Sequence, residues 1–252
     1  MAIYSVVVPL TAAGEPRFRD DNGSAEPRVA AALAAFGSGQ GSEHVALTAL
    51  ADARLLVPIV AVAAGSDGEH EGPGHALADG GDSAAEMSLP TLVGRDGRAA
   101  IPAFTCVETL AMWQRQARPV PVLAGQVWRA AAEDSCAVVV DVAGPVPIAI
   151  DGARLAALAG GRPVPLPHED ADVLAAVHAA AAGQPAIAGL SLAAPGDGSD
   201  LQINVTLAPG CAADDGQEAA RRLGAGVMAG LGGRLRLGIA VAVTPAAGRR
   251  EP

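Results

Sequence analysis

The amino-acid sequence predicts an α+β protein with two mixed α/β-sheet domains joined by a Pro-rich linker. Three observations lead to this fold class. The chain has 252 residues, half of them hydrophobic, which is enough for two domains. Helical and strand patterns are mixed in both halves, without the strict alternation of a doubly wound sheet. The stretch "RPVPLPHED" has prolines at alternate positions, which favours an extended, semi-rigid linker.

These patterns also set the expected domain boundaries. Residues 1–26 are poorly patterned and rich in turn formers, so we expect an irregular segment there. Residues 27–160 then form the first domain, residues 161–167 the linker and residues 168–252 the second domain. Within the first domain, residues 65–86 are rich in Gly, Asp, Glu and His, a composition typical of a mobile acidic loop.

The first domain is expected to begin with two helices. Pro27 suits a first helical position, and apolar residues follow it at helical spacing. Ser42 is placed to cap a second helix with an apolar stripe through Val45, Leu47 and Leu50. The later elements of this domain are expected as strands at 54–62, 87–94, 99–104, 119–125, 136–144 and 145–150, with helices at 126–135 and after the Asp151-Gly152 turn.

The second domain has a complete pattern of its own. Asp170 or Glu169 is placed to cap a helix that carries Val173, Leu174 and Val177 on one face. Further elements are expected as strands at 186–195, 200–209 and 235–243 and a helix at 214–231.

Composition excludes several functions. All 17 basic residues are Arg, so the chain has no Lys for a P-loop or for Schiff-base chemistry. A net charge of −10 makes nucleic acid an unfavourable partner. The N-terminal stretch lacks a basic region before its apolar run, and no long uncharged apolar run occurs, so we expect a cytoplasmic protein without a membrane span. Three widely spaced cysteines favour reduced thiols over disulfides or a zinc site.

The stretch "DGRAAIPAFTCVETLAMW", residues 96–113, combines several local signals. Asp96-Gly97 lies between two apolar runs, which predicts a β-hairpin with a type I′ turn. Thr105 and Glu108 are three residues apart just before a helical pattern, which predicts a capping box. Local backbone structure therefore accounts for most of this stretch.

Two residues of the same stretch have no clear role in a hairpin or a cap. Arg98 directly follows the turn. Phe104 precedes the predicted cap, where it either packs on the sheet or stays partly open to solvent. These two residues are therefore candidates for an interaction surface.

This stretch, together with "ARPVPVLAGQVWRAAAE" and "VVVDVAGP", resembles the N-terminal domain of the SseB family. The family motif is an Asp-Gly-Arg turn, a strand ending in Pro-x-Phe-Thr-Ser, and a helix ending near Trp. The resemblance extends to "DDNGSAEP", to "LADARLLVPIVAV" and to Glu86-Met87, and it covers most of residues 18–160. Residues 168–243 are similar to the C-terminal domain of the family.

The resemblance implies a modulator and carries over no catalytic residues. The family name denotes enhanced serine sensitivity, and the family is associated with a rhodanese-type sulfurtransferase. This chain departs from the motif at Cys106, where the family usually has Ser, so neither hydroxyl nor thiol is expected to be essential there. Residues 83–85 are Ser-Ala-Ala where we would expect a Lys before Glu86.

The hypothesis we favour is a non-catalytic cytoplasmic adaptor or modulator that binds another protein, such as a rhodanese-like sulfurtransferase. It would bind through the hairpin region or through the acidic loop, and it needs no cofactor and no metal. The candidate interaction residues are Asp96, Arg98, Phe104, Thr105, Cys106 and Glu108.

Two alternatives remain open. Cys106 at a helix start could be an activated thiol of a sulfur-handling enzyme, or a small core residue at the first helical turn. A cleft between the two domains could instead make the protein a sensor of a small ligand such as an amino acid. His70 and His75 lie among acidic residues, but their spacing matches no closed zinc pattern, so we predict no metal site there.

Overall fold

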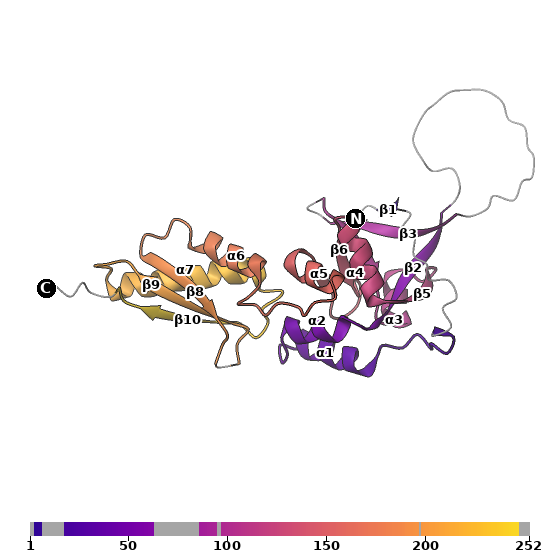
Figure 1. The fold of residues 1–252 in the computed structure, drawn as a ribbon, viewed down its shortest axis with the longest axis horizontal. Helices are drawn as coiled ribbons and strands as arrows, with labels where there is room; N and C mark the ends of the chain where they lie inside the picture. Colours follow the sequence, from indigo (N-terminus) through magenta and orange to yellow (C-terminus); the bar gives the residue numbers. More distant parts are fainter. Residues whose placement is uncertain (1–2, 7–17, 63–85, 95–96, 197, 247–252) are drawn as a thin grey trace, which may run out of the picture.

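The computed structural model describes residues 3–6, 18–62, 86–94, 97–196 and 198–246. It contains two α+β bodies that lie end to end, so the molecule is elongated (Figure 1). Each body has its own sheet and its own hydrophobic core. The α+β fold class predicted from the sequence is confirmed. Of the acidic loop predicted at residues 65–86, residues 65–85 lie outside the described residues, together with His70 and His75, and Glu86 is the first residue of β3.

The first domain is built on a seven-stranded sheet with the order β5-β2-β3-β4-β6-β7, in which β1 also pairs with β3. Most neighbours are antiparallel, but β4 and β6 run parallel because α3, β5 and α4 lie between them in the chain. The strands are β1 (Ile3–Val6), β2 (Arg54–Val62), β3 (Glu86–Val93), β4 (Ala99–Ala103), β5 (Arg118–Leu123), β6 (Ala137–Val140) and β7 (Ile148–Ile150).

β1 is the clearest difference from the expected secondary structure. Residues 1–26 were expected to be irregular, yet Ile3–Val6 pair antiparallel with β3, with Ile3 opposite Leu92 and Val6 opposite Leu89. The strand depends on a partner far along the chain, and local sequence patterns do not show such partners.

Five helices cover the first sheet: α1 (Pro27–Gly37), α2 (Glu43–Leu50), α3 (Val107–Trp113), α4 (Ala124–Glu133) and α5 (Gly152–Ala159). β2 shows how the two faces of the sheet are used. Leu55 and Val57 join the main core with α1, α2, α4 and α5, whereas Leu56 joins a smaller cluster with Phe104 and Leu110. Alternate residues of a strand point to opposite faces, so α3 covers the face opposite the main core.

The predicted Ser42 cap is confirmed, but the predicted stripe on α2 is partly wrong. The Ser42 hydroxyl accepts a hydrogen bond from the Val45 N–H at 3.3 Å. The Val45 side chain is 53% exposed, and the buried side chains of α2 are Glu43, Ala46, Leu47 and Leu50. Glu43 faces inward because two arginines bind its carboxylate, as described below.

The second domain has a three-stranded sheet, ordered β10-β9-β8, with both helices on one face. Its elements are α6 (Ala171–Ala181), β8 (Ile187–Ala193), β9 (Leu201–Leu207), α7 (Ala213–Leu231) and β10 (Ile239–Thr244). β8 and β9 are antiparallel, whereas β10 runs parallel to β9 after α7. Asp170 caps α6 as expected, but Leu174 is 43% exposed and does not join the buried face.

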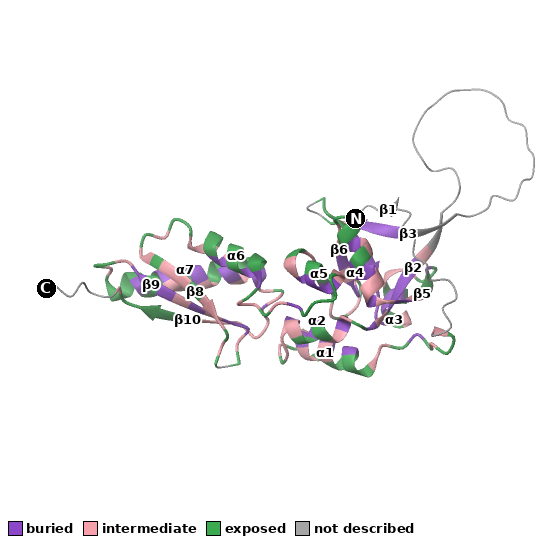
Figure 2. Cartoon of the chain, viewed as in Figure 1, coloured by how far each residue is buried: buried purple, intermediate pink, exposed green. Residues whose placement is uncertain are grey.

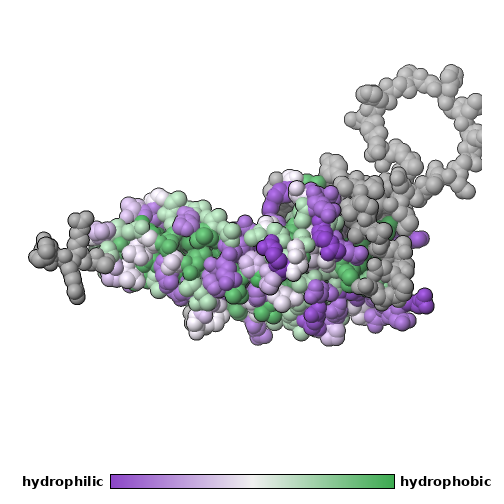
Figure 3. Space-filling view, in the orientation of Figure 1, coloured by the Kyte–Doolittle hydropathy of each residue, from purple (hydrophilic) through white to green (hydrophobic). Residues whose placement is uncertain are grey.

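Burial is concentrated inside each body, and the exposed residues lie on its surface (Figure 2). On the face drawn in Figure 3, the most hydrophilic residues gather over the first domain, while the second domain shows a mixture of apolar and weakly polar residues. Among the described helices, none has both the length and the apolar character that crossing a membrane requires.

Candidate functional site

β3 and β4 form the hairpin that the Asp-Gly pair predicts. The Gly94 N–H donates to the Arg98 carbonyl at 2.9 Å, and the Gly97 N–H donates to the Gly94 carbonyl at 3.0 Å. Gly97 has a φ of +79°, which residues with a Cβ rarely adopt. Because Gly94 pairs with Arg98, the loop is longer than the two-residue type I′ turn expected from the sequence. Asp96 lies outside the described residues.

Phe104 and Thr105 are buried, with 0% and 4% exposure. The Phe104 backbone exchanges two hydrogen bonds with Leu56, of 2.7 and 2.8 Å, and its ring centroid lies 5.6 Å from that of Trp113. The open position considered for Phe104 is therefore wrong, and the packed position is right. Neither side chain can contact a partner protein unless the domain opens.

A buried carboxylate explains why the expected capping box does not form. Asp141 is 3% exposed and accepts hydrogen bonds from the Thr105 N–H (2.9 Å), the Thr105 hydroxyl (2.7 Å) and the Thr109 hydroxyl (2.5 Å). A buried carboxylate needs such donors, so Thr105 serves Asp141 instead of the helix start. α3 begins at Val107 with Cys106 as its N-cap residue and without a side-chain cap.

Asp141 also ends β6 earlier than the sequence suggests. The strand was expected to run to residue 144, but β6 stops at Val140. Asp141 has a φ of +51°, in the left-handed region that Asp enters more easily than most residues. This conformation breaks the strand and allows the Asp141 carboxylate to bind Thr105 and Thr109.

Cys106 and Glu108 lie at the start of α3. The half-buried Cys106 sulfur is 3.6 Å from the Thr109 hydroxyl oxygen. A side-chain hydrogen bond from Cys106, and to a lesser extent the backbone N–H of Glu108, lower the pKa of the Glu108 carboxyl. Catalytic thiols usually have an imidazole or another cation beside them. Among the described residues, the polar neighbours of the Cys106 thiol are the Thr109 hydroxyl and the Glu108 carboxylate.

The segment "DDNGSAEP" packs against this region through Arg54. The Arg54 guanidinium forms an ion pair with Asp21 (2.9 Å) and donates to the carbonyls of Ser24 and Thr105, the latter at 3.0 Å. The Glu26 carboxylate accepts the Arg54 backbone N–H at 2.7 Å. Two of the segments that carry the family resemblance are therefore in direct contact in the folded chain.

α3 presents an apolar side chain to solvent directly beside this packed region. Met112 is 63% exposed, which is the largest exposure among the large hydrophobic residues described. Glu108 lies one turn earlier on the same face of the helix and is also exposed. On the opposite face, Leu110 is 3% exposed and packs with Phe104. We call the exposed face, formed by Glu108, Ala111, Met112 and the following Arg115, the α3 surface.

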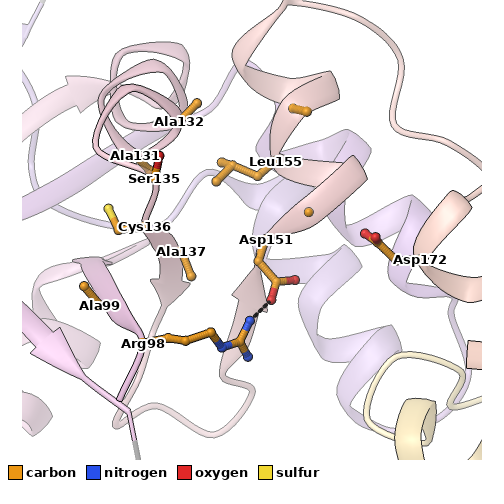
Figure 4. Close-up of a pocket in the computed structure, with 12 residues that line it drawn as sticks. Arg98, Ala99, Ala131, Ala132, Ser135, Cys136, Ala137, Asp151, Leu155 and Asp172 are labelled. Carbon is orange, nitrogen blue, oxygen red and sulfur yellow. Dashed lines mark hydrogen bonds and ion pairs between the residues drawn. The ribbon is translucent and has the colours of Figure 1, made fainter. Parts of the chain in front are cut away.

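A chain of ion pairs runs from the hairpin to the second domain. Arg98 binds Asp151 at 2.7 Å (Figure 4), and the other oxygen of Asp151 binds Arg154 at 2.7 Å. Arg154 then binds Glu43 at 2.6 Å. Arg98, which had no clear role in the sequence, is therefore one end of a network centred on α5 and α2.

The network crosses the domain junction at Glu43. Its second oxygen accepts a hydrogen bond from Arg234 of the second domain at 3.0 Å, and Arg234 also binds Asp170 at 2.5 Å. The neighbouring Arg236 lies 4.4 Å from the centre of the Phe36 ring and donates to the Gly37 carbonyl at 3.1 Å. Both arginines thus tie the turn before β10 to the first domain. We call Glu43, Arg154, Arg234 and Asp170 the junction cluster.

Burial and charge act against each other in this network. Burial raises the pKa of Glu43, an effect that Arg154 and Arg234 oppose. Burial would likewise raise the pKa of Asp151, but hydrogen bonds and charge from Arg98 and Arg154 outweigh it and lower the pKa. Burial alone would lower the pKa of Arg234, whereas Glu43 and Asp170 raise it. Pairing therefore favours the charged forms of Asp151 and Arg234, whereas at Glu43 burial has the larger effect and the pKa is raised.

The sequence interpretation missed Glu43, Arg154 and Arg234 as interacting residues. Arg154 and Arg234 lie 111 and 191 positions after Glu43 in the chain, so local spacing does not connect them with it. One signal was available in the sequence. Glu43 lies at the helical spacing of the apolar stripe on α2, and Arg154 lies next to Leu155 on the buried face of α5. A charged residue inside an apolar stripe indicates a buried ion pair.

A family model for the SseB protein N-terminal domain matches residues 29–157, which is half of the chain. The chain belongs to the SseB family. The match includes the hairpin, α3 and most of α5, so it confirms the predicted resemblance for this part of the chain. The SseB match does not include residues 168–243, whose similarity to the family's C-terminal domain stays a prediction. No curated protein and no solved structure matches the chain.

Proposed function

We propose that this SseB-family protein is a non-catalytic cytoplasmic adaptor or modulator that binds another protein through the α3 surface. The observation that carries the proposal is the position of Met112. Its side chain is 63% exposed, on a helix whose other face is fixed by buried Leu110 and Phe104. A rigidly supported methionine in solvent suits an interface, because Met is flexible and adapts to differently shaped partners.

The residues around Met112 support the same proposal. Glu108 and Arg115 place one charge of each sign beside the methionine, and a polar rim around an apolar centre is typical of protein interfaces. Phe104 and Thr105 support α3 from inside the domain. The Phe104 ring packs on Trp113 of the helix, and the Thr105 hydroxyl donates a hydrogen bond to Asp141. Of the six residues proposed from the sequence, Glu108 is the one that we assign to the contact surface.

The partner that the family resemblance suggests is a rhodanese-type sulfurtransferase. With a net charge of −10, the chain should associate faster with a partner that presents a basic surface, especially at low salt. The three cysteines are free thiols, which suits a reducing compartment.

The proposal can be tested by affinity capture with this chain immobilised as the bait. It is incubated first with a purified rhodanese-type sulfurtransferase from the same cells and then with native lysate. Met112→Glu should abolish capture of the partner, because it places a charge at the centre of the contact. Val45→Glu is the matched control, since Val45 is also an exposed apolar residue of a helix in the first domain, at 53% exposure. It should leave capture unchanged.

Two results would overturn the proposal. The first is capture that is equally strong for wild type, Met112→Glu and Val45→Glu. The second is turnover of thiosulfate by the purified chain that is lost in Cys106→Ser, since this would indicate an enzyme that acts through the thiol.

A further inference from the structure

β10 (Ile239–Thr244) forms one edge of the three-stranded sheet of the second domain (Figure 1). Its inner side pairs with β9 over all six residues without a register shift. On its outer side, no strand lies among the residues that the structure describes. Ala242, Val243 and Thr244 are exposed, Val243 at 37%. The outer row of backbone N–H and C=O groups is therefore open to pairing with another strand.

Each other edge strand that the structure describes has a feature that discourages such pairing. β5 contains Arg118, Pro119 and Pro121, and both charge and proline oppose the addition of a strand. β1 and β7 are only four and three residues long. β8 has a register shift between Ile187 and Gly189. Among the described strands, β10 is therefore the long and regular edge that is left unprotected.

Charge also distinguishes this edge from the chain as a whole. The chain carries a net charge of −10, so like charge opposes the approach of a second copy. Residues 237–246, which include β10, contain no charged side chain. The part of α7 beside β10, residues 223–233, is also uncharged. Two copies can therefore meet at this edge without placing like charges in contact.

The order of side chains in β10 is symmetric about Val241. Ile239 and Val241 pack on the core of the second domain beneath α7, and Val243 shares their face of the sheet. An antiparallel strand of the same sequence can be placed with Val241 opposite Val241. Ile239 then lies opposite Val243 on this face, and on the other face Ala240 lies opposite Ala242. Cross-strand pairs of β-branched residues stabilise a sheet, so the strand is complementary to itself.

We propose that two copies of this chain associate through β10, which pairs with itself antiparallel about a two-fold axis at Val241. A second copy fits this edge better than an unrelated strand does, because its side chains match this order and it is present whenever the chain is. The two sheets join into one continuous sheet with three strands from each copy. The α7 helices of both copies then lie on the same face of that sheet.

The pairing also completes the edge of the second core. Gly224 of α7 lies over Ile239 and Val241, and it has no side chain to cover them. In the dimer, Val243 of one copy and Ile239 of the other cover each other. The contact lies in the second domain, so it leaves both copies of the α3 surface free and goes beyond the adaptor function.

Sedimentation equilibrium of the purified full chain over a range of concentrations measures the association. We expect a monomer–dimer equilibrium. Added salt should strengthen it, because salt screens the repulsion between two copies of charge −10 and the residues in contact are uncharged. Met112→Glu, which changes the α3 surface alone, should dimerise as the wild type does. A failure of this proposal can therefore be told apart from a failure of the adaptor function.

Ala242→Lys tests the edge itself. Ala242 is exposed, so the monomer tolerates a lysine, but a charge there opposes the addition of a strand. The dissociation constant of the dimer should rise about tenfold or more. Ser191→Lys is the matched control, because Ser191 of β8 and Ala242 of β10 are both exposed and lie on either side of Asn204. It should dimerise as the wild type does.

A cross-link tests the register. In the proposed pairing, Ala240 of one copy lies opposite Ala242 of the other with Cα atoms about 4.5–5.5 Å apart, a distance that a disulfide can span. The double variant Ala240→Cys/Ala242→Cys should therefore form a covalent dimer on mild oxidation. Each single variant should not, because neither position lies opposite itself. All of these variants keep Cys106, Cys136 and Cys211, so the single variants also control for the native thiols.

The proposal fails in any of three cases. The first is a chain that stays monomeric at every concentration, which would leave the edge to a strand from another protein. The second is a dimer that is as tight in Ala242→Lys as in Ser191→Lys. The third is cross-linking that is as efficient in the single cysteine variants as in the double variant. If Ala242→Lys melts well below the wild type, the cross-linking comparison decides.

Discussion

Among the described residues of the first domain, two carboxylates are buried, and their surroundings differ. Asp141 lies within the hairpin region, and its donors are hydroxyl groups and one backbone N–H from residues close to the start of α3. Glu43 lies at the domain junction, and its donors are two arginines, one from each domain. The first carboxylate organises one local structure, whereas the second joins distant parts of the chain.

The comparison shows that the part of the sequence with the most local motifs need not be the part that joins the two domains. Residues 96–113 carry several local sequence signals close together, yet Phe104 and Thr105 both lie in the interior of one domain. The junction cluster is assembled from residues without a local motif. Charge placed inside an apolar stripe was the better guide to a long-range contact.

The largest effect is expected at the junction cluster. Glu43→Gln keeps the shape of the side chain but removes the charge between Arg154 and Arg234. We expect a loss of about 3 kcal/mol in the free energy of unfolding. Urea denaturation followed by tryptophan fluorescence measures it, since Trp113 and Trp128 both lie in the first domain. Glu133→Gln, on the exposed end of α4, is the control and should change stability by less than about 0.5 kcal/mol. A change this small in Glu43→Gln would show that the cluster contributes little.

A smaller loss is expected in the hairpin region. Asp141→Asn tolerates the positive φ but replaces one accepting oxygen by an NH₂ group that faces hydroxyl donors. We expect a loss of about 2 kcal/mol, measured as above. Asp134→Asn, at an exposed position, should be close to neutral. A loss larger than that of Glu43→Gln would reverse the order that we infer from the two environments.

The titration of Asp151 should depend on its arginine partner Arg98. The pKa of Asp151 is lowered below its ordinary value of 3.8, so its contribution to stability is present above that pH and is lost as the pH falls toward the lowered pKa. Arg98→Gln removes one of the two arginines that lower the pKa, so the carboxyl should titrate at higher pH. NMR titration of the Asp151 side chain in both proteins measures the change. Identical titration curves would contradict the role given to Arg98.

The smallest effect is expected for Cys106→Ser. The Cys106 thiol contacts the Thr109 hydroxyl and the Glu108 carboxylate, and a Ser hydroxyl can form the same contacts. Stability should change by about 0.5 kcal/mol or less, and partner capture should be unchanged. A substantial loss of either would mean that the thiol has a role that its packing does not explain.

Much of the fold follows from local patterns in the sequence. The helices at residues 27–37 and 213–231, the hairpin of β3 and β4, and the Ser42 and Asp170 caps were all predicted, because their signals lie within a few residues of each other. The capping box at Thr105 failed for the opposite reason. A donor that looked local is used by Asp141, which is 36 residues away in the chain.

The candidate sites could be predicted only in part. The sequence placed Arg98 and Glu108 among the important residues, but it could not show that Arg98 reaches Asp151, 53 residues later. Nor could it show that Phe104, which pairs with Leu56, lies inside and that Met112 of α3 lies outside, because both are apolar. Strand pairing and domain contact decide these points, and both depend on partners that are remote in sequence.

The Pro-rich segment between the domains has a consequence for dividing the molecule. Val164, in that segment, is 5% exposed and belongs to the core of the first domain, and Asp172 of the second domain satisfies the first turn of α5. A fragment that stops at residue 160 would therefore lack a piece of its own interior and a partner for an N–H group. The smallest self-sufficient N-terminal piece should reach at least as far as Asp172.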